Sequence, residues 1–463
     1  MTRVPRRIGW AGGALALLAA GQAPAREVSA MVVVGPDGAA QARVITDAGA
    51  CPAISIDGRK RSMRLRAPAG QMAQRTTLSE AKLSKPSDFP VTTCEARLPK
   101  GARRVTVQGQ ALPAPKAVVR RIVVIGDTGC RLKAADHAYQ ACNDPAAYPF
   151  HRVAEQAAAW KPDLVIHVGD YHYRETPCEP QAANCAASAW GYGWDAWKAD
   201  FFGPAAPLLA AAPWVAARGN HEDCARAGQG WMRFLSPRPL TPQTDCNDPA
   251  NDAATDDAPP YAAPLGGGAQ VIVLDMTTAG TSPTPADDPR HAQFAADYAA
   301  LDRLSRGRAF SFAVLHKPIL GFAAEVKKDA TQGLKPVTAG IQSVFAEKNP
   351  AILPKGVSVI LSGHIHLWEQ ISFSSGHPSQ FIAGFSGTQE DTVPMPPSLP
   401  DGVTPAAGAV VEAFSSWING FGYMTLERRA ADRWSVKVWD LSGKVVNRCQ
   451  ITGRHSKCEK GQV

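Results

Sequence analysis

The sequence predicts an α/β protein in which a small all-β domain precedes a larger domain built on a mixed or parallel sheet. Two observations support this prediction. Between about residues 31 and 110, short alternating stretches are separated by turns, whereas nearly continuous apolar runs begin at Val118. Alternation is typical of strands with one face in water, and continuous apolar runs are typical of strands buried on both faces. The length of 463 residues allows about two or three domains.

The first 25 residues have the pattern of a secretory signal. Arg3, Arg6 and Arg7 precede an apolar run over residues 8–20, and the small residues Ala23-Pro24-Ala25 follow. We expect a signal peptide over 1–25 with cleavage after Ala25. A short membrane anchor is the alternative, but the run is shorter than the roughly 20 residues that span a bilayer. The sequence therefore predicts export to the periplasm or the extracellular space, with no integral membrane segment after cleavage.

The ten cysteines also indicate an oxidising compartment. All of them follow residue 25, their number is even, and the chain has no C-x-x-C pattern of a zinc knuckle. Ten cysteines permit many connectivities, and proximity alone suggests one of them. The suggested pairs are Cys51 with Cys94, Cys130 with Cys142, Cys178 with Cys185, Cys224 with Cys246, and Cys449 with Cys458.

The net charge gives little information about partners. It is +8, and it falls to +5 without the three arginines of the signal. We take this charge to be spread through the chain without a basic run. The sequence therefore predicts no nucleic-acid-binding patch. A general attraction for anionic small-molecule substrates remains.

The first domain is expected over residues 26–112 and resembles a β-sandwich. Its predicted strands are 31–34, 43–46, 54–56 and 105–107, with turns at Pro36-Asp37-Gly38 and Asp57-Gly58. The segment 111–116 contains two prolines, and we interpret it as the linker between the two domains.

The second domain is expected over residues 113–463. A strand at 118–125, a helix at 150–160 and a strand at 164–168 form a βαβ unit. Further strands are predicted at 214–217, 271–274, 310–315, 357–361, 423–426 and 434–439, and long surface loops at 241–260 and 391–405. In open α/β sheets ligands bind at the carboxyl ends of strands, so we expect polar residues at these strand ends to converge.

Ligand-type residues directly follow five of the apolar strands. They are Gly126-Asp127-Thr128-Gly129, Gly169-Asp170-Tyr171-His172-Tyr173, Gly219-Asn220-His221-Glu222, His316-Lys317-Pro318 and Gly363-His364-Ile365-His366. Each motif alone is weak, because Gly-Asp often marks a turn and a single histidine often belongs to the core. Together they predict a metal site, with oxygen and nitrogen donors that suit iron, zinc or manganese.

These five motifs, in this order, resemble those of the calcineurin-like metallophosphoesterases. The patterns D-x-G, G-D-x-x-Y and G-N-H followed by an acid resemble the purple acid phosphatase branch, as does the ending His364-Ile365-His366-Leu367-Trp368-Glu369. The resemblance covers the chain from Val118 to the last strands, and it implies a four-layer αββα sandwich. One departure is Ala313, which stands where valine is usual, in a buried strand that little affects the ligands.

The resemblance also implies a ligand set. Asp127, Tyr173 and His366 would hold one metal ion, Asn220, His316 and His364 would hold the other, and Asp170 would bridge both. Most relatives have a histidine where Gly129 stands, and Tyr173 would fill that vacancy. In the alternative reading Tyr173 is an ordinary aromatic, and Tyr171 or His172 is the functional neighbour.

A charge count favours a mixed-valent pair. Two aspartates, a tyrosinate and a bridging hydroxide give about −4, so a trivalent and a divalent ion leave about +1 to attract phosphate. We therefore expect Fe(III) with a divalent Fe, Zn or Mn ion.

The implied activity is hydrolysis of phosphate monoesters with an acidic optimum, by attack of a metal-bound hydroxide on phosphorus. His221 would be the proton donor and would bind substrate together with Asn220, and Glu222 or Asp223 would orient it. Arg218 and Lys317 would either contact phosphate or be solvated surface charges, and His167 is expected to be structural.

Two rival functions remain open. One is a phosphodiesterase or nucleotidase on the same metal core, and the other is a non-catalytic binding protein on a decayed scaffold. Specificity is expected in the loops 178–194 and 241–260, which show no readable pattern, and the physiological substrate and oligomeric state stay open.

Overall fold

The structure is a computed structural model that describes residues 1–2, 27–77, 79–179, 182–326, 332–391, 399–400, 402–418 and 420–461. Apart from its first two residues, the expected signal peptide over 1–25 lies outside the described residues, as does part of the expected loop 391–405.

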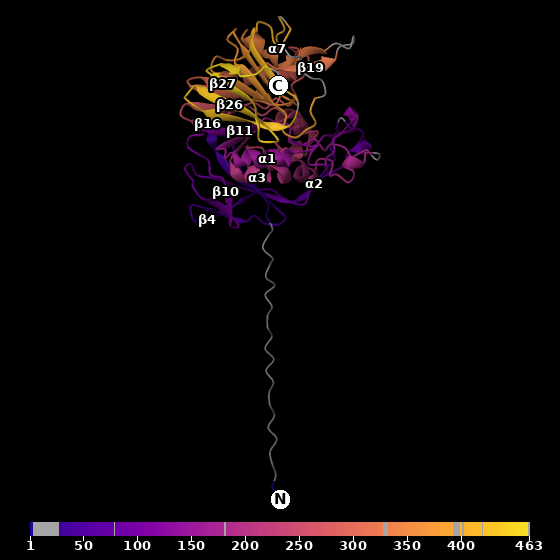
Figure 1. The fold of residues 1–463 in the computed structure, drawn as a ribbon. Helices are drawn as coiled ribbons and strands as arrows, with labels where there is room; N and C mark the ends of the chain where they lie inside the picture. The colour runs from indigo at the N-terminus through magenta and orange to yellow at the C-terminus, as the bar shows by residue number, and fades with distance from the viewer. Residues whose placement is uncertain are drawn as a thin grey trace.

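Two large sheets form the centre of the fold (Figure 1). The first has eleven strands in the order β28 (His455–Cys458), β27 (Val445–Thr452), β26 (Arg433–Asp440), β25 (Gly422–Arg428), β11 (Arg121–Ile125), β14 (Leu164–His167), β15 (Trp214–Ala216), β1 (Glu27–Val34), β2 (Ala40–Thr46), β8 (Thr92–Arg97) and β5 (Arg64–Ala67). The second has seven, in the order β16 (Tyr261–Gly266), β17 (Ala269–Val273), β18 (Phe310–Val314), β21 (Val359–Ser362), β23 (Ser379–Ala383), β22 (Trp368–Phe373) and β24 (Val411–Trp417).

Helices cover the outer face of each sheet, as the alternation of side chains requires. In β11, Ile122 and Val124 enter the core between the sheets, whereas Val123 and Ile125 face the helices. The helices on the first sheet are α1 (Phe150–Ala159), α3 (Gly203–Ala211) and α4 (Gly228–Phe234), and those on the second are α6 (Pro289–Ser305) and α7 (Ala339–Lys348). The predicted four-layer αββα sandwich is therefore confirmed.

The predicted elements agree closely with the observed ones. The largest shift among the first strands is at β1, which begins at Glu27 rather than at Met31. The strand β11 begins at Arg121 rather than at Val118, a residue that is exposed. The short elements are α2 (Trp194–Trp197), α5 (Asp252–Thr255) and the strand pairs β6 (Gly70–Met72) with β7 (Ser87–Phe89), β12 (Leu132–Lys133) with β13 (Ala138–Tyr139), and β19 (Phe322–Val326) with β20 (Gln332–Pro336).

The N-terminal region is all-β, as expected, but it shares strands with the large sheet. A separate sheet of β10 (Gln110–Leu112), β9 (Val105–Val107), β3 (Ala53–Ile56) and β4 (Arg59–Ser62) packs over one face of β1. The strand β1 itself pairs in parallel with β15, where Val33 lies opposite Trp214. The sandwich-like region is therefore continuous with the large sheet as well as joined to it by the linker, and the division at residues 112–113 stays a prediction.

The basic residues are not spread evenly along the chain, and that expectation was wrong. Residues 27–112 hold 13 Lys and Arg against 7 Asp and Glu, whereas residues 113–463 hold 32 against 34. Arg59, Lys60 and Arg61 are all exposed on β4, which is an edge strand. Charged side chains on an edge strand hinder pairing with another chain.

The structure contains the five disulfides that sequence proximity suggested. They are Cys51–Cys94, Cys130–Cys142, Cys178–Cys185, Cys224–Cys246 and Cys449–Cys458. Disulfides persist in oxidising environments, so they indicate an extracytoplasmic location. None of the helices in the described part of the chain has the length and apolar character needed to cross a membrane.

Gly230 on α4 packs against Trp197 with no room for a side chain. A Cβ at this position would lie 2.0 Å from Trp197 Nε1, and Trp197 is fully buried. We expect Gly230→Ala to lower the free energy of unfolding by about 1–3 kcal/mol, because overpacking forces neighbours off their preferred rotamers. Urea unfolding measures the change. Gly49→Ala is the control, since Gly49 has no atom within 4 Å of an added Cβ, and equal losses in both variants would contradict the prediction.

Candidate metal centre

The predicted ligand residues all follow strands that end at one edge of the two sheets. Asp127 follows β11, Asp170 and Tyr173 follow β14, Asn220 follows β15, His316 follows β18, and His364 and His366 follow β21. The strands β11, β14 and β15 pair in parallel, as do β18 and β21. Their carboxyl ends therefore lie together, which brings remote parts of the sequence to one site.

The backbone is strained at three of these residues. The φ angles are 53° at Asp127, 57° at Asp170 and 74° at His364. This left-handed region is uncommon for residues other than glycine, and such residues cluster at functional sites.

Two glycines beside the candidate ligands act in different ways. Gly169 has a φ of 106°, which favours glycine, whereas Gly219 has an ordinary φ of −98°. At Gly219 the reason is space, because a Cβ would lie 2.0 Å from Asp170 Oδ1. Gly169 therefore permits a left-handed turn of the backbone, whereas Gly219 permits the close approach of Asp170.

The hydroxyl of Tyr173 lies at the centre of one group of candidate ligands. It is 2.9 Å from Asp127 Oδ1, 2.9 Å from Asp170 Oδ2 and 3.0 Å from His366 Nε2. The hydroxyl of Tyr171 instead donates to the carbonyl of Ala217. His172 is buried between the rings of Tyr192 and Trp197. Of the three residues considered in the sequence, only Tyr173 meets the other candidate ligands.

A second group surrounds the other side of Asp170. Ligand atoms of Asp170, His316 and His364 lie within 4.8 Å of one another, and His316 Nε2 is 2.9 Å from Asp170 Oδ2. Asn220 lies beside them, because the N–H of the next residue, His221, donates to Asp170 Oδ1 at 2.9 Å. Asn220 Oδ1 is buried without a hydrogen-bond partner among the described residues.

Two of the histidines direct Nε2 toward the site, His366 to the Tyr173 hydroxyl and His316 to Asp170. His366 Nδ1 lies 2.9 Å from the carbonyl oxygen of Gln389, and His316 Nδ1 lies 3.0 Å from that of Val168. A carbonyl only accepts hydrogen bonds, so each Nδ1 carries a proton, and Nε2 is the atom that can bind a metal once it has lost its own proton. Burial lowers the pKa of both rings, but the nearby carboxylates raise it above its usual value, to about 9 for His316. These nitrogens, the unpartnered oxygen of Asn220 and the carboxylates form a donor set that fits two metal ions.

The charges of the site perturb several pKa values. Burial alone would raise the pKa of Asp170, but the charges of His316 and His221 hold it well below its usual range. Burial raises the pKa of Tyr173 well above its usual value, and Asp127 and Asp170 raise it further. Tyr173 is therefore neutral unless a cation lies beside it.

His221 is held by a carboxylate that the sequence interpretation missed. Its Nδ1 lies 2.8 Å from Glu175 Oε1, and its Nε2 lies 3.8 Å from Asp170 Oδ2. Burial lowers the pKa of His221 to about 4, with a contribution from Arg226. Arg226 also pairs with Glu175 and donates to the carbonyl of Asn220 at 2.8 Å. One buried guanidinium group therefore contacts both the carboxylate that holds His221 and the backbone of Asn220.

Glu222 has a different role from the one expected. Its carboxylate accepts the backbone N–H groups of Asp170, Tyr171 and His172, at 3.1, 2.8 and 3.1 Å. It thus fixes the backbone after β14, and the carboxylate in contact with His221 is neither Glu222 nor Asp223. Glu175 follows Tyr173 by two residues, but this spacing does not reveal the direction of its side chain.

Three other residues considered in the sequence have partners within the protein. Arg218 is buried and bonds to Asp256 Oδ1 at 2.7 Å and to the carbonyl of Glu222 at 2.7 Å, and Lys317 donates to the carbonyl of Thr277 at 3.1 Å. Neither is a solvated surface charge. The buried ring of His167 bonds to Thr128 Oγ1 at 3.0 Å, which fits its expected structural role.

Cys224, Cys246 and Asp256 form a second cluster of ligand-type atoms. The two cysteines are joined in a disulfide, so no thiolate is present to bind a metal.

The family model described as calcineurin-like phosphoesterase matches residues 120–367, a range that contains all seven candidate ligands. No curated protein matches the sequence.

Two solved structures have a similar fold. The purple acid phosphatase PPD1 from yellow lupin (Lupinus luteus) seeds has a TM-score of 0.56 at 14% identity, over 95% of this chain and 75% of that chain. PhoD has a TM-score of 0.50 at 12% identity, over 94% of this chain and 92% of that chain. At these identities the similarity shows a common fold. Because the family model covers more than half of its length, the chain belongs to the calcineurin-like phosphoesterase family.

Proposed function

We propose that the protein is an exported phosphatase of the purple acid phosphatase type that hydrolyses phosphate monoesters at a two-metal centre. The family typically binds a binuclear metal centre. The observation that supports the proposal best is the position of the Tyr173 hydroxyl, which lies within 3.0 Å of atoms of Asp127, Asp170 and His366.

In this proposal the ligands are divided as the resemblance implies. Asp127, Tyr173 and His366 hold one ion. Asn220, His316 and His364 hold the other, and Asp170 contacts both. Two ions held close together act as Lewis acids that polarise the phosphoryl oxygens and lower the pKa of a water molecule.

Tyr173 favours Fe(III) paired with a divalent ion of Fe, Zn or Mn. Gly129 supplies no ligand, so the phenol oxygen takes a place next to two carboxylates. Burial and these carboxylates raise the pKa of Tyr173, so the phenolate requires a strongly charged cation beside it. A trivalent ion meets this requirement better than a divalent one.

His221 would protonate the leaving oxygen and, with Asn220, contact the phosphoryl group. The contact with Glu175 holds its ring in place, and Arg226 holds Glu175. We expect an optimum below neutral pH, because a proton donor has to be protonated before each turnover. A maximum well above pH 8 would instead favour a pair of divalent ions.

Export to the periplasm or extracellular space is part of the proposal. The five disulfides support it, as does the signal pattern over residues 1–25. N-terminal sequencing of the exported protein tests the predicted cleavage after Ala25.

Removal of the Tyr173 hydroxyl should abolish the colour of the protein. A tyrosinate bound to Fe(III) absorbs visible light by charge transfer, so the metallated wild-type protein should be coloured and Tyr173→Phe should lose the band. Visible spectroscopy with elemental analysis measures both effects. Tyr171→Phe is the matched control, because its hydroxyl bonds to a backbone carbonyl. A colourless, fully metallated wild-type protein would rule out the phenolate ligand.

Substrate preference separates the proposal from its rivals. We expect 4-nitrophenyl phosphate to be hydrolysed faster than bis(4-nitrophenyl) phosphate by protein that contains two metal ions per chain. The opposite preference would indicate a diesterase. A fully metallated protein that turns over neither ester would indicate a binding protein.

A further inference from the structure

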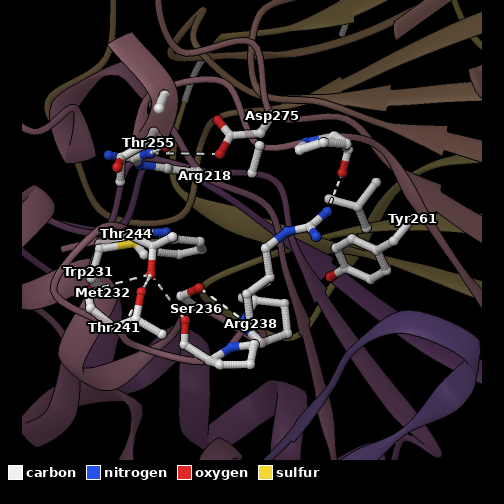
Figure 2. A pocket seen from close by; sticks show the side chains of 17 residues that line it. Arg218, Trp231, Met232, Ser236, Arg238, Thr241, Thr244, Thr255, Tyr261 and Asp275 are labelled. Atoms are coloured by element: carbon white, nitrogen blue, oxygen red, sulfur yellow. Dashed lines mark hydrogen bonds and ion pairs between the residues drawn. The ribbon is translucent and has the colours of Figure 1, made fainter. Parts of the chain in front are cut away.

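A cavity of about 370 Å³ (Figure 2) lies at the carboxyl ends of β15 and β17, which is also the edge of the sheets where the candidate ligands follow their strands. Its walls include Ala216 at the end of β15, Val273 at the end of β17 and Tyr261 at the start of β16. The segment between Ser236 and Pro259 forms much of the remaining wall. None of the seven candidate ligands lines this cavity, so it is a second place on the molecule where a small molecule fits.

The wall formed by residues 236–259 is tied to the rest of the protein. The disulfide Cys224–Cys246 fixes its middle, and Arg75 donates to the carbonyl of Cys246 and pairs with Asp252. Arg238 donates to the carbonyl of Pro259, across the cavity rim. Because these ties are covalent or charge-assisted, the cavity is preformed and does not need a ligand to open it.

Three polar atoms in the cavity wall have no hydrogen-bond partner among the described residues. They are Tyr261 Oη, Thr255 Oγ1 and Asp275 Oδ1. Tyr261 and Thr255 are only 8% and 4% exposed. Figure 2 shows the Tyr261 hydroxyl directed toward the interior of the cavity, with Asp275 on another side of it. Buried polar groups are almost always paired, so these atoms point to a ligand that forms hydrogen bonds.

The charged side chains of the wall already have partners within the protein. Arg218 bonds to Asp256 at 2.7 Å and lies 3.6 Å from Asp275 Oδ2, and Arg238 bonds to Pro259. Among the described residues, the charges of Arg218 and Arg238 are balanced by those of Asp256 and Asp275, so this wall has no net positive charge to attract an anion. The other side chains that touch the space are mostly apolar, and Trp231, Met232 and Val273 are among them.

We propose that this cavity binds a small uncharged molecule with a flat apolar body and a hydroxyl group. The apolar body packs against Trp231, Val273 and the prolines of the 236–259 segment. The hydroxyl group donates to Asp275 Oδ1 or exchanges hydrogen bonds with Tyr261 and Thr255. This site is separate from the metal centre, so the inference does not depend on the proposed catalytic function.

Binding of 2-naphthol to the purified, metal-loaded protein tests the proposal. Inorganic phosphate is added in excess to occupy the metal centre, and calorimetry or the fluorescence of the probe reports binding. We expect one site per chain. Naphthalene, which lacks the hydroxyl, should bind several-fold more weakly, and naphthalene-2-sulfonate should bind at least about tenfold more weakly because the positive and negative charges of the wall balance.

Substitutions locate the probe in the cavity. Ala258→Trp fills the space and should abolish binding, and Ala254→Trp at the rim serves if the first variant folds poorly. Tyr261→Phe should weaken binding by about 2–12-fold, the loss of one hydrogen bond. Ala299→Trp, at an exposed position on α6, and Tyr298→Phe on the same helix are the matched controls.

Each remaining outcome would overturn the proposal. Equal affinity for 2-naphthol in wild-type protein and in both tryptophan variants would mean that the cavity holds only water. Displacement of 2-naphthol by phosphate would place the probe at the metal centre. Equal binding of naphthalene and 2-naphthol would show that the unpartnered polar atoms recognise nothing.

Discussion

Replacing His221 with alanine is expected to lower kcat by about 10²–10⁴-fold, the usual contribution of general acid catalysis. The ring stands against Tyr173, with 3.9 Å between the ring centroids, and its Nε2 faces Asp170. It is therefore placed to protonate a leaving group bound at the centre. Because no proposed ligand is removed, the metal content should stay close to that of the wild-type protein. Steady-state kinetics on an aryl phosphate and elemental analysis of the same sample measure both quantities.

Two further variants test whether the loss of kcat is specific to His221. Glu175→Gln keeps the shape of the side chain but removes the charge that holds the ring, so we expect a smaller loss in kcat than in His221→Ala. His151→Ala removes an exposed histidine on α1 and should leave kcat unchanged. Wild-type turnover in His221→Ala would remove His221 from the mechanism. An equal fall in metal content and in kcat would assign it a structural role.

Replacing Glu95 with alanine is expected to lower the free energy of unfolding by roughly 3–5 kcal/mol, the typical cost of leaving a buried charge without its partner. Glu95 on β8 is 3.1 Å from Arg43 and 3.0 Å from Arg66, two arginines whose side chains are almost completely buried. Arg43 donates to the carbonyls of Phe234 and Ser236 at 2.9 Å each. Glu95 thus balances the charges that hold the N-terminal strands on the catalytic region. Chemical denaturation measures the loss.

The effect should depend on pH in a defined direction. Burial raises the pKa of Glu95, but Arg66, Arg43 and Arg64 together lower it below its usual value of 4.5. A depressed pKa in the folded state contributes stability above the unfolded pKa, and that stability is lost as the pH falls through the folded pKa. The difference between wild-type protein and Glu95→Ala should therefore shrink as the pH falls below about 4.5.

Arg64→Ala is the control for this prediction. Arg64 also contacts Glu95, but its side chain is 71% exposed. Exposed ion pairs contribute little, so this variant should have nearly wild-type stability. A large loss in Arg64→Ala, or no loss in Glu95→Ala, would contradict the assignment of the buried pairs as the stabilising ones.

Much of the fold was predictable because its signals are local. The strand that became β14 and the helix that became α1 were placed within one residue at each end. Disulfides were predictable for a similar reason, because each of the five joins two cysteines that are consecutive along the chain. The pairing of β1 with β15 was not predictable, because nothing in either strand identifies the other as its neighbour.

Within the site, the sequence identified the ligand-type residues by kind and by order. It did not identify which other residues contact them and hold them in place. Glu175 was missed and Glu222 was given its role, because both carboxylates stand close to ligand residues along the chain. Arg218 was read as a possible phosphate contact or a surface charge, whereas it is buried against Asp256 and the carbonyl of Glu222. The cavity lined by the 241–260 segment had no signal in the sequence beyond an expectation of specificity in that loop.

The sequence by itself determined the order of strands, helices and ligand-type residues, and hence the family, because short motifs at strand ends are properties of neighbouring residues. Only the tertiary structure decided which carboxylate contacts His221, which charges are buried, and where the N-terminal strands join the sheet. The physical reason is that burial, ion pairing and strand pairing depend on distances between segments far apart in the chain. Those distances are fixed only when the apolar faces of both sheets pack together.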